Sequence, residues 1–79
     1  MEIKVLGTGC TKCKTLEKMV INKLAELNLP ASVTKEEDIV KIMSYGVMGT
    51  PGLVIDGKVV LSGRLPSDTE LTQILTQNK

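Results

Sequence analysis

The chain has 79 residues, of which 42% are hydrophobic, and ten basic and nine acidic residues give it a formal net charge of +1. This length encloses one modest core, so we expect a single domain over residues 1–79, built from aliphatic side chains because Tyr45 is the one aromatic residue. No run of like charge would track a phosphate backbone, and no apolar stretch is long enough for a signal peptide or a membrane span. We therefore expect a cytoplasmic protein that binds neither nucleic acid nor membrane.

The first third of the chain predicts a strand followed by a long amphipathic helix. Residues 1–6 are rich in Ile, Val and Leu, which favours a strand in the middle of a sheet, and the glycines at positions 7 and 9 end it. From Thr11 the apolar residues recur three and four positions apart, and the charged residues, including Lys23, take the other face. Pro30 stops this helix. Its apolar positions are Leu16, Met19, Val20, Leu24 and Leu27.

The middle of the chain predicts a weaker strand at residues 31–35 and a shorter helix at residues 36–45, which acidic residues lead and Gly46 ends. Asp56-Gly57 lies between the apolar segments 53–55 and 58–61, and this dipeptide tolerates the positive backbone angles of a two-residue hairpin turn. We therefore predict a β-hairpin there. The apolar face of the shorter helix would consist of Ile39, Val40, Ile42 and Met43.

The last predicted element is a helix that begins at a capping box. The Ser67 hydroxyl would accept from the amide of Glu70, and the Glu70 side chain would reach back to the start of the helix. Leu71, Ile74 and Leu75 would form its inner face. The predicted order is strand, helix, strand, helix, two hairpin strands and helix.

Two cysteines, Cys10 and Cys13, stand where the first strand and a glycine-containing loop give way to the first helix. A disulfide between them closes too small a loop to stabilise a secreted mini-protein, so the pair indicates catalysis or metal binding. At a helix N-terminus the unpaired amides and the helix dipole stabilise a thiolate, and Lys12 and Lys14 add positive charge. Such surroundings lower a cysteine pKa from about 8.5 into the range of roughly 3.5–7.5. We predict that Cys10 attacks a partner disulfide and that Cys13 resolves the mixed disulfide, which leaves a Cys10–Cys13 disulfide.

Two other interpretations of the cysteine pair stay open. Free cysteines also pack as small buried hydrophobic residues. A C-x-x-C loop before a helix is also how small copper and zinc carriers present two thiolates, which would make Cys10 and Cys13 metal ligands. Such carriers usually have Met two residues before the first cysteine, where this chain has Thr8. Because the sequence contains no histidine, a four-coordinate zinc site would also need carboxylates or a second chain.

Pro51 stands at the entrance to the first hairpin strand, directly after Thr50. Proline is permitted there because its missing amide falls outside the strand ladder. By itself it indicates only the end of a loop, because cis bonds are about 5% of X-Pro bonds. Combined with C-x-x-C at the start of the first helix, it indicates a cis peptide bond.

These two motifs, in this order, resemble the thioredoxin and glutaredoxin superfamily along essentially the whole chain. The sequence is similar in particular to the small thioredoxin-like family called redox-active disulfide protein 2, in which residues like those at 7–10 and 51–53 are typical. The resemblance implies an α/β, thioredoxin-like fold of minimal β-α-β-α-β-β-α order, with a four-stranded mixed sheet flanked by helices. The first two strands would be parallel, and the hairpin would be antiparallel to them.

The resemblance also implies roles around the cysteines. Pro51 would be cis and pack beside Cys10 and Cys13, and the backbone of Thr50 would pair with an extended substrate segment. Gly63 would leave room for the substrate backbone, although a simple turn glycine fits its position equally well. No cofactor is implied other than the Cys10–Cys13 disulfide itself.

The expected partners are proteins that contain disulfides, and we expect the chain to act as a monomer. Of the glycine-glycine-x-x-aspartate segment with which glutaredoxins bind glutathione, only Gly63 and a helix-start Asp68 are present. The electron donor is therefore expected to be of the thioredoxin-reductase type rather than glutathione. Soft side chains that suit either a docking surface or the rim of the core are Met43, Tyr45, Val47 and Met48.

Overall fold

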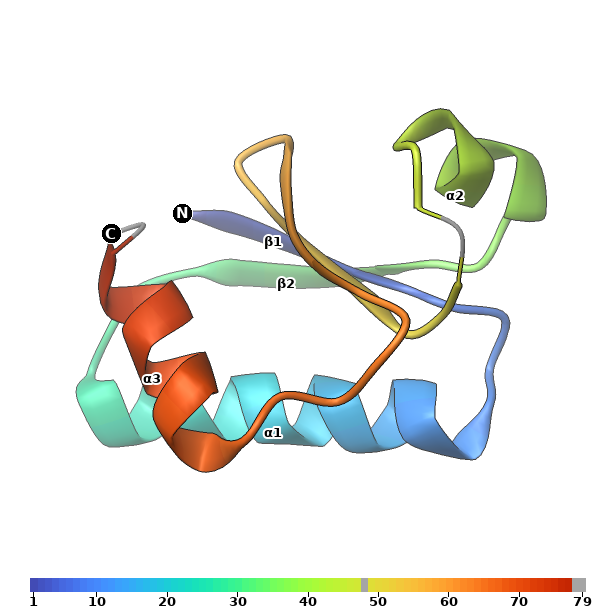
Figure 1. The fold of residues 1–79 in the computed structure, drawn as a ribbon. Coiled ribbons are helices and arrows are strands. Elements are labelled where there is room, and N and C mark those ends of the chain that lie inside the picture. Colours follow the sequence, from blue (N-terminus) through green and yellow to red (C-terminus); the bar gives the residue numbers. More distant parts are fainter. Residues whose placement is uncertain (48, 78–79) are drawn as a thin grey trace.

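The computed structural model describes residues 1–47 and 49–77 (Figure 1). Met48, the last of the four soft side chains, lies outside the described residues. The predicted order of elements is confirmed, with most boundaries moved by one or two residues. The elements are β1 (Glu2–Leu6), α1 (Thr11–Leu27), β2 (Ser32–Glu36), α2 (Ile39–Ser44), β3 (Gly52–Ile55), β4 (Lys58–Ser62) and α3 (Asp68–Gln77).

The four strands form one mixed sheet in the order β2-β1-β3-β4. β1 pairs in parallel with β2, and β3 is antiparallel to both β1 and β4, as the resemblance implied. Asp56 and Gly57 have φ angles of 49° and 83°, which are the positive angles that the two-residue turn between β3 and β4 requires. Asp56 also accepts the amide of Glu2 through Oδ1 at 2.8 Å, so the hairpin tip is attached to the start of β1.

Helices cover both faces of the sheet: α1 and α3 lie on one side and α2 on the other (Figure 1). The larger cluster of buried side chains lies under α1 and α3, and the smaller one joins α2 to the opposite face. Both are aliphatic, as the composition requires. The larger cluster contains Ile3, Val5, Leu16, Val20, Leu24, Leu53, Ile55, Leu61, Leu71 and Leu75, and the smaller Leu6, Ile42, Val47 and Val54.

Helix α1 confirms the predicted periodicity but not the exposure of Lys23. Its C-cap, Asn28, takes the left-handed conformation with φ 55°, so the helix ends before Pro30 as predicted. Lys23 is 5% exposed, and its Nζ lies 3.1 Å from Glu26 Oε2 and 2.7 Å from Asp68 Oδ1. Hydrogen bonds to Asp68 and then Glu26 raise the Lys23 pKa. The prediction that Lys23 lies on the exposed face was wrong, because α3 docks against this side of α1 and places Asp68 next to Lys23.

Helix α2 is shorter than predicted and buries less. Residue 36 continues β2, and Asp38 caps the helix by accepting the Val40 amide at 2.9 Å. With six residues the helix presents one side chain to the core, which is Ile42. The other three members of its predicted apolar face are exposed: Ile39 by 55%, Val40 by 71% and Met43 by 66%.

The start of α3 has half of the predicted capping box. Ser67 Oγ accepts the Glu70 amide at 3.1 Å as predicted. The Glu70 carboxylate does not reach back, and both of its oxygens accept from the guanidinium of Arg64 instead. A planar guanidinium matches a carboxylate with two parallel hydrogen bonds, which is a stronger arrangement than one bond to an amide. Within residues 1–47 and 49–77, no helix is long and apolar enough to cross a membrane.

Candidate functional site

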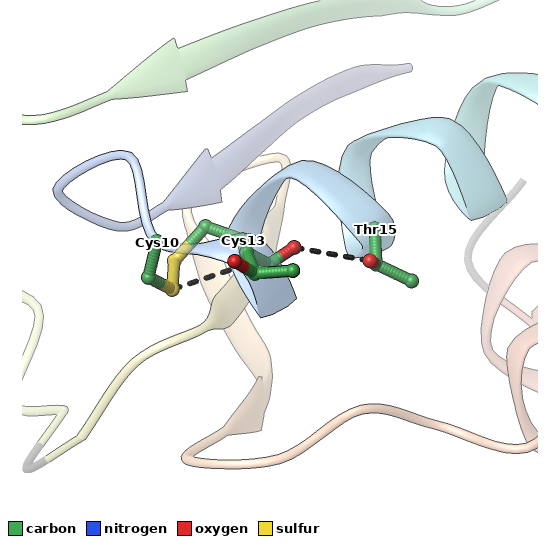
Figure 2. Close-up of a disulfide and its surroundings, with 4 residues drawn as sticks. Cys10, Cys13 and Thr15 are labelled. Atoms are coloured by element: carbon green, nitrogen blue, oxygen red, sulfur yellow. Dashed lines mark hydrogen bonds between the residues drawn. A yellow bond between two sulfur atoms is a disulfide. The ribbon is translucent and has the colours of Figure 1, made fainter.

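Cys10 and Cys13 lie at the junction between the loop after β1 and the start of α1, and a disulfide joins them (Figure 2). Cys10 is the N-cap residue, with the extended angles φ −71° and ψ 164°. Its carbonyl accepts the amide of Lys14 at 3.1 Å, and its Sγ accepts the amide of Cys13 at 3.1 Å. The Cα atoms of the two cysteines are 5.1 Å apart. The sulfur of Cys10 therefore takes the place that a serine or aspartate oxygen usually occupies at an N-cap.

The two sulfurs differ in access to solvent. Cys10 is exposed, whereas Cys13 is 5% exposed because it stands on the face of α1 that carries Leu16 and Val20 into the core. A large partner can therefore reach the Cys10 sulfur more easily than the Cys13 sulfur.

The charge at this end of α1 is positive. Lys12 and Lys14 are exposed in the first turn, which contains no acidic residue. The free amides of a helix N-terminus carry a partial positive charge as well. Positive charge at a helix N-terminus is, in general, the setting in which a cysteine thiolate is favoured over the thiol.

Thr50, in the loop before β3, and Cys13 both lie next to Gly7. The Thr50–Pro51 peptide bond is cis, and Pro51 is buried. A Cβ atom placed on Gly7 would lie 4.0 Å from Thr50 Cβ and would also overlap the Sγ of Cys13. The structure therefore brings Thr50 and Cys13 to the same glycine, although 37 positions separate Thr50 from Cys13 along the chain.

Gly63 follows β4 and lies at the same end of the sheet. Its amide donates to the carbonyl of Pro51 at 2.9 Å, and a Cβ on Gly49 would come within 3.5 Å of its Cα. Its φ of +78° is a left-handed conformation, and a Cβ at this position would meet no atom within 4 Å. The backbone conformation by itself therefore favours glycine at position 63.

Two hollows lie at residues named above, one at Cys13 and one at Thr50. One, of about 250 Å³, lies beside Cys13, and we call the other, of about 570 Å³, the α2 groove. The hollow beside Cys13 is lined by Val5, Gly7, Gly9, Cys13, Lys14, Lys35 and Glu37. The α2 groove is lined by Ile39, Ile42, Met43, Gly46, Val47, Gly49 and Thr50.

Two of the soft side chains predicted to form a docking surface lie in the α2 groove, and a third lies against β1. Met43 and Val47 line the α2 groove. Tyr45 does not, because it faces β1, where its hydroxyl accepts from Lys4 Nζ at 3.4 Å. This contact also raises the Lys4 pKa.

Sequence reasoning missed Gly7, since a glycine at the end of a strand has the same appearance whether it ends the strand or makes room for another side chain. Its place three residues before Cys10 was the one available signal. It also missed Lys35 and Glu37, which reach the hollow beside Cys13 only because β2 pairs with β1. Among residues 1–47 and 49–77, no three Cys, His, Asp or Glu side chains gather in a way that could hold a metal ion.

Comparison with known proteins gives consistent matches over nearly the whole chain. A family model described as a thioredoxin domain matches residues 1–76. A thioredoxin of Methanothermobacter thermautotrophicus is 36% identical over 76 residues, which cover 96% of this chain and 99% of that protein. A thioredoxin of Methanocaldococcus jannaschii is 34% identical over 73 residues, which cover 92% of this chain and 84% of that protein.

Proposed function

This chain belongs to the thioredoxin family and is a thiol-disulfide oxidoreductase, and we propose that it reduces disulfides in other proteins by exchange through Cys10 and Cys13. One observation carries this proposal. Cys10 is exposed at a helix N-terminus, and its disulfide partner Cys13 is buried one turn further on. A substrate can then reach the Cys10 sulfur, while the Cys13 sulfur is buried next to it.

In the proposed reaction the Cys10 thiolate attacks one sulfur of the substrate disulfide, and the other substrate sulfur leaves as a thiolate. The Cys13 thiolate then attacks the Cys10 sulfur of the mixed disulfide, which forms the Cys10–Cys13 bond and releases the second substrate thiolate. Two electrons pass from the protein dithiol to the substrate, whose sulfurs end as thiols after protonation. The amides of the first turn, with Lys12 and Lys14, would hold Cys10 as the thiolate that begins this sequence.

The substrate would bind along the loop that leads to β3. In this proposal the backbone of Thr50 pairs with an extended segment of the substrate, Pro51 presents that backbone beside the disulfide, and Gly63 leaves the opposite side open. The exposed backbone at Gly63 and the proximity of Thr50 to Gly7 and Cys13 support this placement. The α2 groove, which begins at Thr50, would take an apolar side chain of the same segment.

The electron donor in this proposal is a reductase of the thioredoxin-reductase type, and the chain acts as a monomer in the cytoplasm. Asp68, the helix-start carboxylate in the place of the glutaredoxin aspartate, is paired with Lys23 at 2.7 Å. One oxygen of this carboxylate is therefore already bound by an ammonium group of the same chain. This pairing supports a protein donor over glutathione.

The direct test is reduction of a model protein disulfide by the pure protein with dithiothreitol as the electron source, with the copper and zinc content of the same sample measured in parallel. The proposal expects catalysis above the rate with dithiothreitol alone and none by Cys10→Ser. Wild-type protein that is inactive and carries one tightly bound metal ion per chain would overturn it in favour of a metal carrier.

The role of the α2 groove is tested with two disulfide-linked peptides that differ only in whether Leu or Gln stands beside the attacked cysteine. Burying one apolar side chain is worth about 1.5–3 kcal/mol when complete, so partial burial predicts a preference of about tenfold for Leu in kcat/KM. Met43→Ser should reduce this preference, whereas Val40→Ser should not, because Val40 is as exposed on the same helix but does not line the groove. Equal loss in both variants would remove the groove from the proposal.

A further inference from the structure

We propose that Gly7 sets the reduction potential of the Cys10–Cys13 pair. Because glycine has no side chain, it leaves room for the Cys13 sulfur in the disulfide. This inference rests on the proposed function, in which the pair cycles between dithiol and disulfide. Its basis is steric. A Cβ atom on Gly7 would overlap Cys13 Sγ and would lie 2.8 Å from Cys13 Cβ, closer than side-chain carbons approach one another in proteins.

The backbone angle of Gly7 is not what requires glycine at this position. Gly9, two residues later, has φ +87°, where a side chain would be strained, but Gly7 is outside the left-handed region. Its φ angle is therefore outside the range in which a side chain is strained. The contact with Cys13 is therefore what excludes a larger residue.

Gly7 is also held too firmly to move away from Cys13. Its amide donates to the carbonyl of Glu36 at 3.0 Å, which continues the pairing of β1 with β2 by one residue. Leu6, the residue before it, is fully buried in the smaller core cluster. Thr50 Cβ lies 4.0 Å from the Cβ position, so this side chain also contacts the site of the added methyl group. A methyl group at position 7 would therefore displace Cys13 rather than Gly7.

Displacement of Cys13 affects the two redox states unequally. In the disulfide, the Cys13 sulfur is bonded to Cys10, which is the N-cap of the same helix, so the sulfur has no other position to take. In the dithiol, the sulfur can rotate about its Cα–Cβ bond toward the hollow of about 250 Å³ beside Cys13, which relieves the contact with Sγ and leaves the contact with Cβ common to both states. A side chain at position 7 thus destabilises the disulfide more than the dithiol and makes the protein a stronger oxidant.

The test is the equilibrium of wild type and Gly7→Ala with mixtures of reduced and oxidised dithiothreitol. The two protein thiols give two electrons and two protons to oxidised dithiothreitol, which becomes the dithiol as the Cys10–Cys13 bond forms. We expect at least a tenfold shift toward the reduced protein in Gly7→Ala, which for a two-electron couple corresponds to about 30 mV. The control is Gly57→Ala in the hairpin turn, which strains a glycine of φ +83° far from the cysteines and should leave the equilibrium unchanged.

Thermal unfolding of each redox form gives a second measurement that a merely structural effect would not reproduce. Gly7→Ala should lower the melting temperature of the oxidised form more than that of the reduced form, whereas Gly57→Ala should lower both equally. Equal losses in Gly7→Ala, or an unchanged equilibrium with dithiothreitol, would overturn the inference. A wild-type pair that does not exchange with dithiothreitol at all would instead overturn the proposed function.

A double-mutant cycle keeps the inference testable if Gly7→Ala does not fold. Cys13→Gly removes both atoms that the new methyl group would meet. The melting temperature lost through Gly7→Ala should then be much smaller in the Cys13→Gly protein than in the oxidised wild type. An undiminished loss, or failure of the double variant to fold where Cys13→Gly folds, would show that Cys13 is not what requires glycine at position 7.

Discussion

The amide of Gly63 donates a 2.9 Å hydrogen bond to the carbonyl of Pro51, and so joins the chain after β4 to the turn that enters β3. Gly63 makes this bond with φ +78°. The bond holds the two segments that would flank a bound substrate, and the left-handed conformation of Gly63 sets the direction that the chain takes after it.

Replacing Gly63 with Ala should therefore destabilise the fold. A residue with a Cβ in the left-handed region costs roughly 1–2 kcal/mol, and 1 kcal/mol lowers the melting temperature of a domain this small by about 4–8 °C. Gly63→Asn is the matched control, because asparagine tolerates this conformation better, and it should lose less. Melting curves of the three proteins decide the question, and equal losses for Ala and Asn would contradict it.

The unequal exposure of the two cysteines predicts different defects in their serine variants. Cys10→Ser should abolish reduction of protein disulfides, because no exposed thiolate remains. Cys13→Ser should accumulate covalent complexes with substrate, because the mixed disulfide forms but is not resolved. Non-reducing gel electrophoresis after mixing with an oxidised substrate measures both outcomes, and full activity in either variant would contradict the assigned order.

The lysines of the first turn should speed the reaction of Cys10. In the reduced protein, we expect Lys12→Gln and Lys14→Gln each to slow alkylation of Cys10 by iodoacetamide severalfold at neutral pH, because less of the sulfur is thiolate. Lys18→Gln is the control, since Lys18 is exposed on the same helix beyond its first turn. Equal alkylation rates in all variants would leave the helix N-terminus as the sole source of activation.

Lys23 predicts a loss of stability at alkaline pH. Its pKa is raised above the ordinary value of 10.5 by Asp68 first and Glu26 second, so the folded state holds this proton more tightly than the unfolded state. The stabilisation is complete below about 10.5 and is lost as the pH rises through the raised pKa. The melting temperature of wild type should then fall by several degrees relative to Lys23→Met, which keeps the apolar stem without the proton. Parallel pH profiles would contradict this.

Glu70 predicts the opposite dependence at acidic pH. The guanidinium of Arg64 lowers the pKa of this carboxyl below its ordinary value of 4.5. Its contribution is complete above about 4.5 and is lost as the pH falls through the lowered pKa. The difference in melting temperature between wild type and Glu70→Gln should therefore close in acid. Ser67→Ala removes the cap and not the charge, so its difference from wild type should persist at low pH.

The features that the sequence predicted correctly are set by residues close together in the chain. The period of apolar residues in α1, the Asp56-Gly57 turn and the N-cap position of Cys10 each depend on a few neighbours. The failures depend on where side chains and helices lie in the folded chain. Glu70 pairs with Arg64 rather than the helix start, and Ile39, Val40 and Met43 stay exposed because α2 has room for one core contact.

By itself the sequence determined the chemistry: two cysteines at a helix start, an adjacent positive charge, and a proline at the mouth of the hairpin. What only the tertiary structure decided is which residues surround that chemistry. Pairing of β1 with β2 and β3 brings Gly7, Cys13 and Thr50 together, and docking of α3 on α1 buries Lys23. Local patterns specify helices, strands and turns, because their hydrogen bonds and steric limits lie within a few residues. Contacts between distant residues depend on how those elements pack, and no short stretch of sequence contains that information.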